Sequence, residues 1–119
     1  MALRDSMRDT AASYLRPSER VQVVFGAQTR SAFIGGILFI VLNKYRIFAV
    51  TNERILVLDS GKWGMKKAIG VLAELPRSTR LGPASGVWHV IPVNDENLRV
   101  HRRFFKDIEA ADANGSFAP

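Results

Sequence analysis

Lys44 and Arg46 are two basic residues whose type and spacing could bind an anionic ligand. They frame the start of a β-rich run at 45–50, where alternation along a strand would place both side chains on one face. An ammonium and a guanidinium group on the same face can make charge-assisted hydrogen bonds to phosphate oxygens. The pair indicates an anion-binding strand face. The alternative is a solvated outer face that binds no ligand.

A second group of cations surrounds an aromatic residue. Lys62, Lys66 and Lys67 flank Trp63 in a stretch that opens with the glycine-rich turn 59–64. Amines beside an indole ring suit a membrane interface or a nucleic acid. An exposed turn without any partner is the alternative.

The segment 32–42 contains eleven residues without a charge. A helix that crosses a bilayer needs about 20 apolar residues, so this run is too short to do so. It predicts either a buried strand or helix of the core, or an interfacial element whose flanking cations stay at a headgroup layer. The side chains expected to contact a membrane or a partner are Phe33, Ile34, Ile37, Leu38 and Phe39, together with Trp63.

Residues that catalyse reactions or bind metals are scarce in this sequence. There is no cysteine, and the two histidines, His89 and His101, have no acid near them at helical spacing. No serine lies in a nucleophile elbow. Gly61 and Lys62 lack the upstream glycine and the following Ser or Thr of a phosphate-binding loop. We therefore predict no enzymatic activity, no cofactor and no bound metal.

The net charge of +6, from 17 basic and 11 acidic residues, suits an anionic partner. Arg99, His101 and Arg103 share one face of a predicted strand and could bind phosphates. We expect instead that they pair with acids of the fold, namely Asp95, Glu96, Glu109 or Asp112. Nucleic-acid binding ranks low, because the sequence has no interleaved aromatic platform and no basic recognition helix.

Residue periodicity predicts a mainly β chain with a helix at each end. Helical spacing occurs in 5–15 and 104–112, and β-rich patterns occur in 20–26, 45–50, 54–58, 67–75, 79–81, 87–91 and 98–102. We expect one domain over 14–112, after a tail or short helix at 1–13 and before a flexible tail at 113–119. The first twenty residues contain no apolar stretch of the kind that secretion signals have, so a cytoplasmic protein is expected.

In the segment Val50-Thr51-Asn52-Glu53-Arg54-Ile55-Leu56-Val57-Leu58-Asp59, a Thr-x-x-Arg turn precedes an aliphatic strand that Arg54 would start. Together with 74–81 and 100–108, this segment resembles the bacterial pleckstrin-homology (PH)-like domains, in particular short single-domain actinobacterial proteins. The resemblance implies a β-barrel or sandwich of about seven antiparallel strands, capped by a C-terminal helix. It also implies that Arg30, Lys44 and Arg46 cradle the phosphates of a ligand.

These features predict a binding module without catalytic activity. In the leading hypothesis, Arg30, Lys44 and Arg46 meet anionic lipid head groups, while the segment 32–42 contacts acyl chains, with the protein peripheral on the inner face of the plasma membrane. The alternative is a protein-binding or homo-oligomerisation module that uses the same apolar segment.

Overall fold

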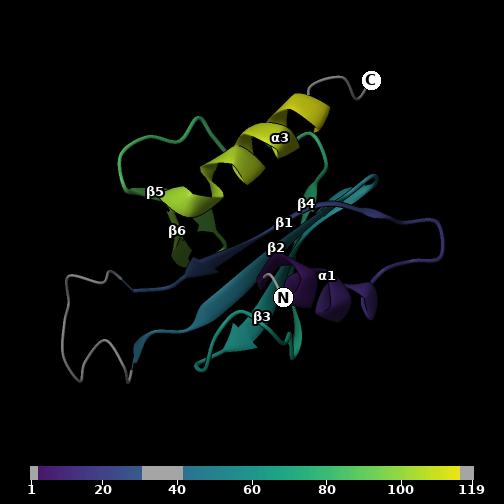
Figure 1. Ribbon diagram of the computed structural model, residues 1–119, viewed down its shortest axis with the longest axis horizontal. Coiled ribbons are helices and arrows are strands. Elements are labelled where there is room, and N and C mark those ends of the chain that lie inside the picture. The colour runs from purple at the N-terminus through teal and green to yellow at the C-terminus, as the bar shows by residue number, and fades with distance from the viewer. Residues whose placement is uncertain (1–2, 31–41, 116–119) are drawn as a thin grey trace.

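The computed structural model of the protein describes residues 3–30 and 42–115 (Figure 1). Its mainly β composition, with a helix at the C-terminal end, confirms the predicted fold class. Phe33, Ile34, Ile37, Leu38 and Phe39 lie outside the described residues. In chain order the elements are α1 (Leu3–Ala12), β1 (Val21–Gln28), β2 (Tyr45–Thr51), β3 (Arg54–Gly61), β4 (Gly70–Pro76), β5 (Trp88–Val93), β6 (Glu96–His101), the 3-10 helix η2 (Arg102–Phe104) and α3 (Phe105–Gly115).

In the described part of the chain, six antiparallel strands form one curled, half-barrel sheet in the order β4-β3-β2-β1-β6-β5 (Figure 1). β1 to β4 pair with their neighbours in sequence. The β5–β6 hairpin joins the other side of β1, where Gln28 pairs with Arg99. This arrangement is consistent with a PH-like barrel whose open end is covered by a C-terminal helix.

The two central strands, β1 and β2, are buried on both faces. Residues 23–28 of β1 and 46–51 of β2 are all buried, and strand alternation allows this only if both faces of the sheet are covered. α1 packs against both strands with Met7 fully buried, and α3 packs against β1. Within the core, Phe25 stacks on its cross-strand neighbour Phe48 with ring centroids 4.7 Å apart.

The Thr51-x-x-Arg54 turn joins β2 to β3 and is fixed by a buried ion pair. The Thr51 hydroxyl oxygen accepts the N–H groups of Glu53 and Arg54, each at 3.1 Å. Nη2 of Arg54 lies 2.7 Å from Oε1 of Glu19, whose side chain is fully buried. The hydrogen bonds from Arg54, from the Arg16 backbone and from Thr51 lower the pKa of Glu19 to about 2. Arg54 therefore starts β3, as predicted, and also anchors the segment before β1.

The segment 79–81, which we predicted as a short strand, has no regular secondary structure. The backbone N–H groups of Leu81 and Gly82 donate to the two carboxylate oxygens of Asp112 in α3, at 2.8 and 2.9 Å. Because these donors are taken by a side chain, the segment is fixed to the helix and not to the sheet.

The N-terminal segment forms the short helix α1, and Arg4 ties it to the other end of the chain. Nη2 of Arg4 lies 2.6 Å from Oδ2 of Asp107 and also donates to the carbonyl oxygen of Arg103 at 3.1 Å. The guanidinium groups of Arg4 and Arg103 lie 5.2 and 4.7 Å from the ring centroid of Phe104. α1 is therefore held beside η2 and the start of α3.

Candidate functional site

Arg46 does not face a ligand, contrary to our expectation. Its side chain is only 5% exposed, with Nη1 2.9 Å from Oδ1 of Asp59 on β3 and Nη2 2.7 Å from Oε2 of Glu96 on β6. One carboxylate comes from β3, the neighbour of β2, and the other from β6, which lies beyond β1 on the opposite side. Together they neutralise the guanidinium charge. Arg46 therefore holds the strands together, and this removes it from the predicted phosphate-binding set.

Arg30 and Lys44 lie close together where β1 ends and β2 begins. The Thr29 N–H donates to the Lys44 carbonyl at 2.9 Å, and the Lys44 N–H donates to the Thr29 hydroxyl at 2.9 Å. Both cations line a cavity of about 310 Å³ that is also lined by the carboxylates of Asp95 and Glu96. Since these carboxylates would repel an anion, a phosphate site at Arg30 and Lys44 stays a prediction.

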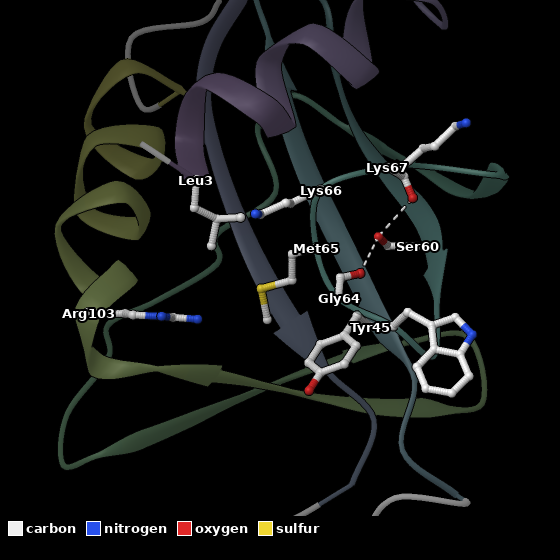
Figure 2. Close-up of a pocket in the computed structure, with 9 residues that line it drawn as sticks. Leu3, Tyr45, Ser60, Gly64, Met65, Lys66, Lys67 and Arg103 are labelled. Carbon is white, nitrogen blue, oxygen red and sulfur yellow. Dashed lines mark hydrogen bonds between the residues drawn. The ribbon is translucent and has the colours of Figure 1, made fainter. Parts of the chain in front are cut away.

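A different cavity, of about 410 Å³, combines cations with apolar walls (Figure 2). We call it the Met65 cavity. It forms where the first residues of α1 and β2 meet the end of β3, the loop 62–69 and η2. None of its lining residues, all from the described part of the chain, is acidic: they are Leu3, Tyr45, Ser60, Trp63, Gly64, Met65, Lys66, Lys67 and Arg103.

The loop 62–69 is held in place by polar contacts at both of its ends. The Ser60 hydroxyl lies 2.6 Å from the carbonyl oxygen of Gly64 and 3.0 Å from that of Lys67 (Figure 2). The Ala68 N–H donates to the Thr10 hydroxyl of α1 at 2.9 Å. These contacts fix the loop against β3 and α1, so its side chains are presented on a supported backbone.

Met65 anchors the middle of this loop to the sheet through a close approach to Gly26. The Met65 side chain is almost completely buried. A β-carbon at Gly26 would overlap the Met65 sulfur and lie 3.0 Å from its Cγ and Cε atoms. Only a residue without a β-carbon leaves room for this side chain, so Gly26 on β1 shapes the floor of the cavity.

Two cations project into the Met65 cavity from opposite sides. Figure 2 shows the Lys66 side chain pointing toward Leu3 and the Arg103 side chain pointing toward Met65, whereas the Lys67 side chain points away. Arg103 is positioned by η2, where its N–H donates to Nδ1 of His101 at 3.1 Å.

A smaller cavity of about 170 Å³ adjoins the first and shares Met65 and Arg103 with it. It is also lined by Arg99, His101 and the Trp88 ring. Within residues 3–30 and 42–115, neither Arg99 nor Arg103 forms an ion pair, which corrects our expectation that acids of the fold would pair with them. Some carboxylates of the fold have other partners, because Glu96 pairs with Arg46, Asp107 pairs with Arg4, and Asp112 accepts backbone N–H groups. Asp95 lines a cavity together with Arg99 but forms no ion pair with it.

Trp63 stands at the rim of the Met65 cavity with 93% of its surface exposed. Lys62, Lys66 and Lys67 surround it in the sequence, and none of the three forms an ion pair with another described residue. The apolar side chains of Ile69, at the end of the loop, and Val71, on β4, are also exposed. The residues of the predicted second basic cluster thus lie on the same loop as an exposed aromatic ring, and their role in binding stays a prediction.

Sequence reasoning did not find Leu3, Tyr45, Met65 or the role of Arg103 in this cavity. These residues are spread over the whole chain, and apolar residues of ordinary type carry no signal of a binding site. The one usable signal for Arg103 was its place in the basic group Arg99, His101 and Arg103, which could bind phosphates.

Neither a protein-family model, nor a curated protein, nor a solved structure matches this chain. Among the residues that the structure describes, no helix has the length and apolar character needed to cross a membrane. The function has therefore to be inferred from the residues of the site.

Proposed function

We propose that this protein is a non-catalytic, PH-like binding module that attaches peripherally to anionic membrane surfaces through the loop 62–69. The observation that carries the proposal is the exposed Trp63 ring among three lysines without ionic partners. An indole ring places an apolar body and a polar N–H at the boundary between acyl chains and water. The lysines of the same loop supply attraction to anionic head groups.

The expected affinity of this surface is moderate and depends on salt. Each lysine near an anionic membrane contributes about 1 kcal/mol, so Lys62, Lys66 and Lys67 together contribute about 3 kcal/mol. Because these amines are exposed, the attraction decreases as the ionic strength rises. Burial of the Trp63 ring adds a contribution that salt does not weaken.

Cosedimentation with vesicles tests the proposal. We expect the protein to bind vesicles that contain phosphatidylglycerol, and not vesicles of phosphatidylcholine alone. Lys62→Glu replaces an attractive charge with a repulsive one, at a cost of about 2 kcal/mol, so binding should weaken about thirtyfold. Trp63→Ala should weaken binding at both low and high salt.

Arg20→Glu is the matched control for charge. Arg20 is exposed and precedes Val21, which pairs with Thr51 at the end of the sheet away from Gly61 and the loop 62–69. The net charge changes equally in both variants. Equal, negligible binding to both vesicle types, or an equal loss in Arg20→Glu and Lys62→Glu, contradicts the proposal.

Self-association is the second candidate function, and it rests on the edge strand β4. Val71 and Leu72 of β4, and Ile69 just before it, are exposed, and the outer side of β4 is unpaired in the described sheet. An exposed apolar edge can pair with a second copy. Light scattering tests self-association, because a protein that stays monomeric at high concentration does not self-associate through β4.

A further inference from the structure

Two of the cations around the Met65 cavity point into it, whereas Lys67 points away (Figure 2). Lys66 comes from the loop 62–69 and Arg103 from η2, and both side chains point into the cavity (Figure 2). No carboxylate lines this cavity or the adjoining one within the described part of the chain. Two cations that point into one cavity, with no acidic residue in its walls, offer hydrogen-bond donors to an anionic group.

The walls between these cations are apolar. Leu3, Tyr45 and Met65 line the cavity together with the two cations (Figure 2), and the highly exposed Trp63 also lines it. A free inorganic phosphate would use the cations and leave these walls in contact with water. An anion that carries an alkyl chain would use both, because its chain would remove the apolar side chains from water.

We propose that the Met65 cavity binds one molecule of an anionic amphiphile. The phosphate or carboxylate head lies between Lys66 and Arg103, and the first part of the alkyl chain runs over Met65 toward Trp63. The cavity volume of about 410 Å³ lies within the usual range for small-molecule sites, roughly 300–1,000 Å³. This inference rests on the proposed membrane function and deepens it, since it adds a site of defined stoichiometry to a surface attraction.

Calorimetric titration with monomeric dodecyl phosphate, below its micelle concentration, tests the site in the absence of a membrane. We expect saturable binding of one molecule per chain, with inorganic phosphate and the uncharged dodecyl maltoside each binding at least about tenfold more weakly. Vesicles that contain phosphatidic acid form a separate arm, which distinguishes a lipid head group from a soluble amphiphile as the source of the anion.

Two pairs of neighbouring residues provide matched variants with equal changes of charge. Lys66→Ala and Arg103→Gln should each weaken dodecyl phosphate binding about tenfold, because each removes a charge-assisted hydrogen bond to the head. Lys67→Ala and Arg102→Gln should change it less than about twofold, since the Lys67 side chain points away and Arg102 lines neither cavity. Thermal unfolding of each variant checks that it folds.

Several results would overturn the inference. These are an absence of saturable binding, equal losses in both members of a pair, or equal affinity for dodecyl phosphate and either control compound. If such a result occurs while anionic vesicles still bind through Trp63 and Lys62, the membrane function stands and the cavity site falls. If dodecyl phosphate binds one to one while vesicles do not bind, the cavity site stands and the membrane function falls.

Discussion

Replacing Gly26 with alanine should force Met65 out of its place on the sheet. The new β-carbon would overlap the Met65 sulfur, so the end of the flexible Met65 side chain must move, and we expect this move to expose it. Loss of this burial costs about 1.5–3 kcal/mol. Alanine is favoured over glycine inside a strand by about 0.5–1 kcal/mol, which offsets part of the cost. The free energy of unfolding should therefore fall by about 1–2 kcal/mol.

Urea unfolding of four proteins measures this effect as a double-mutant cycle. The set consists of the wild type, Gly26→Ala, Met65→Ala and the double variant. Without the long side chain at 65, the alanine at 26 meets no overlap, so Gly26→Ala should be neutral or stabilising by about 0.5–1 kcal/mol in that background. The coupling free energy between the two positions should then be about 2 kcal/mol.

An equal cost of Gly26→Ala in both backgrounds would refute this reasoning. It would mean that the glycine is needed for the backbone of β1 and not for the approach of Met65. A stabilising effect in the wild-type background would refute it as well, because Met65 would then be free to move without loss of burial.

Two further predictions concern the buried ion pairs. The pKa of Glu19 is lowered from 4.5 to about 2, so the charged carboxylate contributes about 3 kcal/mol to the free energy of unfolding. This contribution is complete above about pH 5 and is lost as the pH falls through the folded-state pKa. In urea unfolding, Glu19→Gln should remove this part of the pH dependence between about pH 5 and 2. Arg46→Met should lower the free energy of unfolding by about 2–3 kcal/mol, because Asp59 and Glu96 lose their shared partner but keep some contact with water. Lys44→Met, at an exposed position, should change it by less than about 0.5 kcal/mol; an equal effect of both substitutions would contradict the role given to Arg46.

Local patterns predicted the elements of this fold well. Alternation and β-branched residues predicted the strands around Thr51 and Arg54, and helical spacing predicted α3. The prediction of a strand at 79–81 was wrong because Asp112, distant in the sequence, accepts the backbone N–H groups of Leu81 and Gly82. A short segment of this kind is decided by a partner that no local pattern reveals.

The candidate site was predicted less well than the fold, and Arg46 shows why. Its spacing from Lys44 was consistent with a shared open face, but its two carboxylate partners come from β3 and β6. Whether a cation is free depends on such long-range pairs. The cluster around Trp63 was easier to recognise, because all of its residues belong to one loop.

The contact of Arg4 with Asp107 has a consequence for the order in which the molecule assembles. The two residues are 103 positions apart, and Leu3 and Arg103 line the same cavity. During synthesis, one wall of the cavity therefore emerges at the start and the other about a hundred residues later. Contacts of such high sequence separation form late because closing the intervening chain costs entropy. The nascent chain can therefore build its central strands well before it acquires a complete cavity.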